Sequence, residues 1–98
     1  MAQNRVVVLN EARLGKECEW QLCLQWCRYE FKDNTEQMGY RYIWRRPNGH
    51  QQGARGQARI PSLARMMELM SMAIKEGWGH HMAEYEFNGI DDNDDDEE

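Results

Sequence analysis

The chain has 98 residues, of which 41% are hydrophobic and 30% charged, and its formal net charge is −5. This length allows one domain with one modest core. The acids are unevenly placed: residues 91–98 hold seven of the 17, so residues 1–90 keep ten acids against 12 basic residues, a net of +2. We therefore expect a single domain over residues 1–90, followed by a disordered acidic tail, Asp91–Glu98.

The same numbers argue against several classes of protein. Residues 1–10 contain one arginine and an apolar run of only four residues, so we expect no signal peptide. No apolar run approaches the roughly 20 residues that cross a membrane. Three cysteines, an odd number, do not suit a secreted disulfide framework. We expect a cytoplasmic protein with reduced thiols and no membrane partner.

The first apolar segment is short and β-branched. Arg5–Leu9 indicates either an edge strand or an arm that pairs with another subunit. Residues 10–17 are polar, include Gly15, and predict a connection.

The next segment, Cys18–Lys32, fits two periodicities. As a helix, it would align Trp20, Leu24, Cys27 and Phe31; as a strand, it would place Leu22, Leu24 and Trp26 on one face. The aromatic content favours a strand. A β-bulge near Trp26–Cys27 would then explain why the apolar face changes along it.

Tyr40–Arg46 predicts a strand with two unlike faces, entered through a hairpin loop at residues 33–39. Aromatic side chains (Tyr40, Tyr42 and Trp44) point one way, and Arg41, Ile43 and Arg45 point the other. Pro47-Asn48-Gly49 predicts a turn. Arg55–Ile60 alternates again and predicts the second strand of a hairpin. The arginine face of this hairpin would comprise Arg41, Arg45, Arg55, Gln57 and Arg59.

A helix is expected directly after the hairpin. Ser62 can cap its N-terminus, and Gly77 is placed to end it. Its apolar stripe comprises Leu63, Met66, Met67, Met70, Ala73 and Ile74. The stripe is broad for a helix that covers one small sheet, so the helix is buried on two sides or meets a second subunit, and we expect a homodimer. Residues 78–90 are semi-apolar and are expected to dock back onto the domain.

Together these elements predict an α+β fold. An antiparallel sheet of three to four strands would carry one main α-helix on one face. No catalytic motif is present, and no cofactor or metal site is expected: the three cysteines form no C-x-x-C pair, and His50, His80 and His81 lie far from them. The chain is therefore expected to act by binding, without catalysis.

The strongest functional signal is a concentration of arginine. Residues 40–65 contain six arginines and no acid. The planar arginine side chain donates two hydrogen bonds to a phosphate, and aromatic neighbours can stack on bases. The candidate nucleic-acid-binding residues are Arg41, Trp44, Arg45, Arg46, Arg55, Gln57 and Arg59. Two other interpretations stay open: a solvated face paired with Glu17, Glu30 or Glu36, and a face for an acidic protein partner.

This region resembles the single-strand-binding domain of the transcriptional coactivator called positive cofactor four, and more loosely its Whirly and PUR relatives. The likeness covers residues 31–74. It rests on the strand Gly39–Arg46, the turn Pro47–Gly49 and the Gly- and basic-rich run Gly53–Ile60 before the helix. It implies dimers of curved antiparallel sheets, with helices behind and single-stranded nucleic acid across the strands. It also implies backbone contacts from Arg45, Arg46, Arg55 and Arg59, and stacking by Trp44.

We therefore expect a small non-enzymatic protein that binds single-stranded DNA or RNA, in transcription or in DNA or RNA metabolism. The alternative is a protein-interaction module, such as a small bacterial or phage adaptor or inhibitor. It would use the arginine face or the tail, Asp91–Glu98, to bind a protein partner. Pairing of the arginines with carboxylates inside the fold would favour this alternative.

Overall fold

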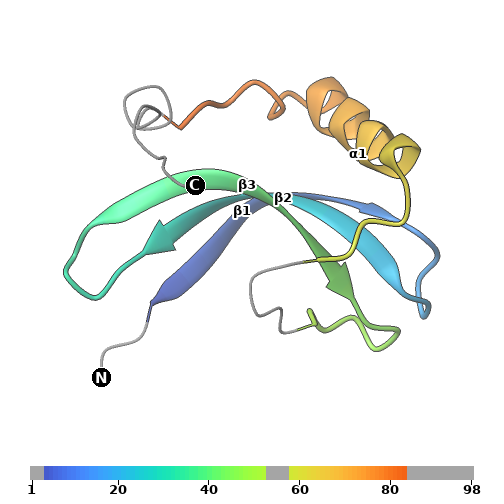
Figure 1. Cartoon of the computed structure of the whole chain (residues 1–98), viewed down its shortest axis with the longest axis horizontal. Helices are drawn as coiled ribbons and strands as arrows, with labels where there is room; N and C mark the ends of the chain where they lie inside the picture. The colour runs from blue at the N-terminus through green and yellow to red at the C-terminus, as the bar shows by residue number, and fades with distance from the viewer. Residues whose placement is uncertain (1–3, 53–57, 84–98) are drawn as a thin grey trace, which may run out of the picture.

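The structure, a computed structural model, describes residues 4–52 and 58–83. Its elements in these residues are β1 (Arg5–Leu14), β2 (Gln21–Glu30), β3 (Glu36–Arg45) and α1 (Leu63–Lys75). The strands form an antiparallel sheet in the order β1-β2-β3, and α1 lies on one side of it (Figure 1). The predicted α+β fold, an antiparallel sheet with one main helix on one face, is confirmed. No helix in the described ranges is long and apolar enough to cross a membrane.

The ambiguous segment over residues 18–32 is a strand. As the central strand, β2 pairs with β1 on one side and with β3 on the other, from Gln21 opposite Arg45 to Glu30 opposite Glu36. Residues 21–27 are all buried. Burial on both faces explains why the apolar residues of this segment follow no single alternation.

The predicted irregularity near Trp26–Cys27 is present, but it belongs to the neighbouring strand. Cys27 pairs with Val8 and Trp26 pairs with Asn10, so Leu9 is the extra residue and the β-bulge lies in β1. The prediction placed the bulge at the right level of the sheet and in the wrong strand.

The first strand is longer than expected. Of the two alternatives for Arg5–Leu9, the edge strand is the one observed. β1 continues to Leu14, so the predicted connection over residues 10–17 was wrong for residues 10–14. Polar composition suggested a loop there. Pairing with β2 overrides that local preference, because an edge strand tolerates polar side chains on its exposed positions.

The third strand and the turn after it match their predictions more closely. β3 begins at Glu36, so the predicted loop was too long at its C-terminal end. The turn at Pro47–Gly49 is confirmed, because the Gly49 backbone N–H donates to the Arg46 carbonyl over 2.7 Å.

The prediction of a second hairpin strand over Arg55–Ile60 was wrong for the described residues of this segment, 58–60. After the turn, Gln51 forms an isolated bridge with Arg45, and the Gln52 N–H donates to the Trp44 carbonyl over 2.8 Å. Residues 58–60 are not in a strand. Residues 53–57, and with them Arg55 and Gln57, lie outside the described residues. Alternation alone could not separate a strand from an extended coil here.

The helix has both predicted ends. The Ser62 hydroxyl accepts a hydrogen bond from the Arg65 backbone N–H over 3.2 Å. At the other end, Gly77 has φ of +91°, a conformation that favours glycine, and its N–H donates to the Ile74 carbonyl.

The core lies between α1 and the sheet. Its buried residues are Ala12, Leu22, Leu24, Trp26, Leu69, Ala73 and Trp78. The chain after α1 runs back over the sheet, where the His81 ring stacks on Trp26 with centroids 4.6 Å apart and the Tyr40 hydroxyl donates to the Trp78 carbonyl. Docking of this segment is thus confirmed for residues 78–83. Residues 84–90 and the predicted acidic tail lie outside the described residues.

Candidate binding face

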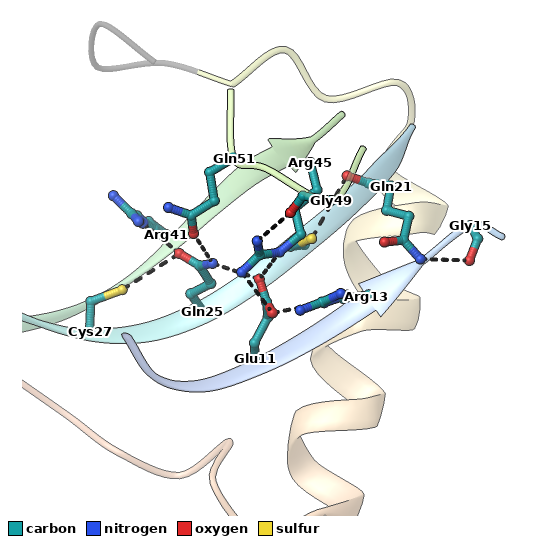
Figure 2. A network of polar contacts seen from close by, with 11 residues as sticks. Glu11, Arg13, Gly15, Gln21, Gln25, Cys27, Arg41, Arg45, Gly49 and Gln51 are labelled. Carbon is teal, nitrogen blue, oxygen red and sulfur yellow. Dashed lines mark hydrogen bonds and ion pairs between the residues drawn. The ribbon is translucent and has the colours of Figure 1, made fainter. Parts of the chain in front are cut away.

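The side of the sheet that faces away from α1 carries a connected set of polar side chains (Figure 2). We call it the polar face. It contains Glu11 and Arg13 of β1, Gln21, Cys23, Gln25 and Cys27 of β2, Arg41, Ile43 and Arg45 of β3, and Gln51. The predicted division of β3 is confirmed, because its arginines lie here while Tyr40 and Tyr42 contact the residues of α1 and the segment after it.

Glu11 and Arg45 form the central ion pair of the polar face. They come from the two outer strands and meet above β2. The Arg45 Nε donates to Glu11 Oε2 over 2.9 Å, and a terminal nitrogen of the same guanidinium donates to Oε1 over 3.2 Å. The other terminal nitrogen donates to the Gly49 carbonyl over 2.8 Å. Arg45 therefore holds the turn after β3 and the edge strand β1 in fixed positions relative to the sheet.

Gln25 is the second centre of the network, and it is completely buried. Its amide nitrogen donates to Glu11 Oε2 and to Gln51 Oε1, each over 2.6 Å. Its amide oxygen accepts from the Arg41 Nε over 2.7 Å. A buried side-chain amide is costly unless its donors and acceptor are satisfied, and here all three are used.

The pKa of Glu11 records the balance of these contacts. Burial favours the neutral acid and is the largest single influence, raising the pKa of this carboxyl. The hydrogen bonds from Arg45, Gln25 and Arg13 together outweigh burial and hold the pKa below its ordinary value. Glu11 also raises the pKa of Arg45 by hydrogen bonding. Both groups are therefore charged at neutral pH.

Two thiols lie beneath this layer. Cys23 and Cys27 are free and completely buried. Burial raises the pKa of Cys23 to about 11, and the negative charge of Glu11 adds to the rise. Burial also raises the pKa of Cys27. Both thiols stay protonated at neutral pH, so neither is a nucleophile.

Two arginines of the polar face retain binding capacity. Arg13 uses its Nε to donate to Glu11 Oε1 over 2.8 Å, and Arg41 uses its Nε on Gln25. The terminal nitrogens of Arg13 have no hydrogen-bond partner in residues 4–52 and 58–83, whereas the Arg41 guanidinium also interacts with the neutral thiol of Cys27. Arg13, Arg41 and Arg45 carry three positive charges and Glu11 carries one negative charge, so these four side chains have a net charge of +2. The arrangement can bind anions.

The structure brings together only part of the predicted site. Arg41 and Arg45 lie on the polar face, and Arg46 is exposed at the start of the turn. Trp44 lies on the opposite side of the sheet, where its Nε1 donates to the Arg59 carbonyl over 2.9 Å. Arg59 itself is exposed in the coil before α1. The aromatic group and the strand arginines therefore do not share one surface.

Four important residues of the face were missed from the sequence: Glu11, Arg13, Gln25 and Gln51. Glu11 and Arg13 were assigned to a connection. The one available signal was the period-two run of polar and thiol side chains at Gln21, Cys23 and Gln25, which marks a second face of the strand.

Two of the three carboxylates expected to neutralise the arginine hairpin, Glu30 and Glu36, pair with other arginines, and no ion pair of Glu17 occurs in the described residues. Glu30 accepts from the Arg28 Nε over 2.8 Å and also lies 3.5 Å from Arg5. Glu36 lies 3.9 Å from Arg28. Arginines therefore do pair with carboxylates inside the fold, but the carboxylate that pairs with Arg45 of the predicted hairpin is Glu11.

No cluster of three or more His, Cys, Asp or Glu side chains that could hold a metal ion occurs in the described part of the chain. Comparison with family models, with curated proteins and with solved structures finds no match to this chain. The likeness to the positive cofactor four family therefore stays a prediction.

Proposed function

We propose that this chain is a small non-enzymatic protein whose polar face binds the phosphate backbone of single-stranded nucleic acid. One observation carries the proposal: Arg13 and Arg41 are each held by their Nε on a sheet face that α1 does not cover, and no ion pair in the described residues uses their terminal nitrogens. Anchoring an arginine by one nitrogen reduces the entropy that it loses when the other two bind a phosphate.

The position of the aromatic side chains limits the mode of recognition. Trp44, Tyr40 and Tyr42 make their contacts on the helix side of the sheet, so they do not offer bases a stacking platform beside the arginines. Contacts to phosphate position a strand without reading its sequence. We therefore expect binding with little sequence preference.

The number of arginines sets the salt dependence. Arg45 is occupied by Glu11 and Gly49, which leaves Arg13, Arg41 and the exposed Arg46 as phosphate ligands. Neutralising about three phosphates predicts a slope of about −2 in log K against log salt on a single strand.

The direct test is fluorescence anisotropy of a labelled mixed-sequence single-stranded oligonucleotide at low and at physiological salt. We expect a double variant, Arg13→Ala with Arg41→Ala, to bind at least tenfold more weakly and to reduce the salt slope by about 1.4. The matched control is Arg65→Ala, which removes an exposed arginine of α1. It should change the affinity less than twofold. Equal binding by the double variant and the wild type would remove the basis of the proposal.

A protein-interaction module is the second candidate, and internal pairing favours it. Ion pairs occupy Arg5, Arg28, Arg45 and Arg65 within the fold. An acidic polypeptide would then be the ligand of the polar face. Adding poly-glutamate to the anisotropy assay separates the two. Displacement of the oligonucleotide by less than an equal charge concentration of poly-glutamate would favour an acidic protein partner, and displacement only by a large excess would favour nucleic acid.

A further inference from the structure

Helix α1 exposes a row of large apolar side chains that the core does not use. Leu63 is 75% exposed, Met67 66%, Met70 43% and Ile74 66%. We call these four the exposed row. Their spacing of four, three and four residues places them on one face of the helix. The buried residues of α1, Leu69 and Ala73, lie beside that face. The broad stripe of the sequence is thus two adjoining faces, and the sheet covers one of them.

The exposed row has the pattern of a helix-pairing seam. Its spacing is that of two heptads with apolar d and a positions. The positions that flank such a seam are uncharged: Ala64, Met66, Ser71 and Ala73. The charged side chains of α1 lie elsewhere, and two of them, Arg65 and Glu68, pair with each other over 2.7 Å. A second helix bearing the same row would therefore meet no like charge at the seam.

A pocket opens beside one half of the row. It has a volume of about 220 Å³, and its walls include Tyr40 and Tyr42 of β3, Met70 and Ile74 of α1, and Gly79. These walls are apolar, and the polar ends of the two tyrosines are used on backbone carbonyls. The pocket therefore adjoins the C-terminal half of the row, Met70 and Ile74, and its walls do not include the N-terminal half, Leu63 and Met67.

We propose that the exposed row is the surface through which two copies of this chain dock, with their α1 helices antiparallel around a two-fold axis between Met67 and Met70. This arrangement places Leu63 against Ile74 of the second copy and Met67 against Met70 of the second copy. The N-terminal half of each row then lies beside the pocket of the other copy. A two-fold interface requires such self-complementarity, and the row supplies it.

The exposed area supports a dimer of moderate affinity. At roughly 100 Å² for each side chain, the row leaves on the order of 400 Å² of contiguous apolar surface, which is as large as the largest patches that monomers leave to water. The walls of the pocket add to this apolar area, which brings it closer to the roughly 800 Å² per partner of a stable interface. We expect a dissociation constant in the micromolar range, since the interface would be small for a protein–protein interface. This inference uses α1 and β3 and does not depend on nucleic-acid binding.

The first test is sedimentation equilibrium of the full chain from about 1 to 200 μM. The wild type should become a dimer across this range, and Met67→Glu should remain a monomer because two carboxylates would meet at the axis. Leu63→Glu, at the most exposed position, is a second variant with the same expected loss. Val6→Glu, an equal change at an exposed valine of β1, should dimerise like the wild type. Circular dichroism shows that each variant is folded. A wild type that stays monomeric, or a Met67→Glu variant that still dimerises, overturns the proposal.

The second test distinguishes the antiparallel geometry. In a Cys18→Ser background, a mixture of the Leu63→Cys and Ile74→Cys variants should form a mixed disulfide under mild oxidation. Leu63→Cys alone should not cross-link, because the two Leu63 positions would lie roughly 16 Å apart along the helices, which is 11 residues at about 1.5 Å each. Cross-linking of Leu63→Cys with itself, and none between Leu63→Cys and Ile74→Cys, would overturn the antiparallel arrangement.

Discussion

Glu11 is the residue on which the polar face depends most. It accepts hydrogen bonds from Arg45, Arg13 and Gln25, so one carboxylate orients a side chain from each of the three strands. Its side chain is only 12% exposed and that of Arg45 is 17% exposed, so solvent screens this pair less than a surface ion pair. Glu11 thereby holds Arg45 and Arg13 directly, and it also holds Gln25, whose amide oxygen accepts from Arg41.

The first prediction concerns this carboxylate. Glu11→Gln should lower the free energy of unfolding by about 2 kcal/mol at pH 7. The hydrogen bonds to this side chain lose their charge, and the amide nitrogen of the new glutamine, itself a donor, faces a donor of Arg45, Arg13 or Gln25. Urea denaturation measures this change. Glu68→Gln, which removes the exposed partner of Arg65, is the control and should cost less than about 0.5 kcal/mol.

The pH dependence of that difference has a definite sign. The pKa of Glu11 is lowered in the fold, so its stabilising contribution is complete above the ordinary value of 4.5 and is lost as pH falls through the lower folded pKa. The unfolding free energies of the wild type and Glu11→Gln should therefore converge below about pH 4.5, where the protonated acid resembles glutamine. A gap that stays constant between pH 7 and pH 3 would contradict the role given to this charge.

The second prediction concerns the thiols. Cys18 is exposed, whereas Cys23 and Cys27 are buried and have raised pKa values. A thiol-specific chromogenic disulfide reagent at pH 8 should therefore react quickly with one thiol per native chain and with all three after unfolding in guanidinium. Cys18→Ser should abolish the fast reaction. Fast reaction of two or three thiols in the native protein would show that the layer above β2 opens readily.

At the scale of the elements, the two turns of the sheet place different demands on glycine. Gly15, between β1 and β2, has φ of +118°, and a Cβ there would lie 2.8 Å from the Trp20 carbonyl oxygen. Gly49, after β3, has φ of +89° and open space around it. The first turn is therefore restricted by both conformation and contact, and the second by conformation alone.

The third prediction follows from this contrast. Gly15→Ala should destabilise the fold by about 3 kcal/mol, since strain and a backbone clash add. Gly49→Ala should cost about 1 kcal/mol, from strain alone. Thermal unfolding followed by circular dichroism would rank the two variants. Equal losses would mean that the chain around Gly15 shifts to accept a methyl group.

The sequence predicts elements better than it predicts their pairing. The ends of α1 could be read from Ser62 and Gly77 because caps are local chemistry. The bulge was assigned to the wrong strand because its location depends on how β1 meets β2, and Leu9 carries no local signal for it. The Glu11–Arg45 pair joins residues 34 positions apart, and only the register of all three strands brings them together. The candidate site was therefore predicted in part: the arginines of β3 were found, and the residues that orient them were not.

At the scale of the whole molecule, the two proposed surfaces lie on opposite sides of the sheet. The polar face points away from α1, and the exposed row belongs to α1. A dimer through the row would leave both polar faces free, so one long strand could bind both copies and gain avidity.

The fourth prediction tests this separation. Met67→Glu should bind a short oligonucleotide with the affinity of the wild type and a long one more weakly, because only the dimer gains from the second face. The double variant at Arg13 and Arg41 should still dimerise. Anisotropy with oligonucleotides of two lengths gives the first result, and sedimentation gives the second. Loss of short-oligonucleotide binding in Met67→Glu would show that the surfaces are coupled.

The fifth prediction concerns the acidic C-terminal segment. Ending the chain at Ile90 removes seven acids and changes the formal net charge from −5 to +2. The shortened protein should bind an anionic strand more tightly than the full chain, with the difference largest at low salt, because long-range repulsion is then least screened. Anisotropy titrations at two salt concentrations measure it. Equal affinities at low salt would mean that this charge has no effect on binding.

The bulge at Leu9 also affects how readily the protein aggregates in a concentrated solution. β1 is ten residues long, and its outer edge pairs with no other strand among the described residues. A flat edge of that length is a template for fibril growth, in which one chain after another adds to a continuous ladder. The extra residue interrupts the regular spacing of N–H and carbonyl groups near the middle of β1 and leaves two short stretches. Deleting Leu9 should restore one uninterrupted edge and increase the tendency of β1 to pair with another chain.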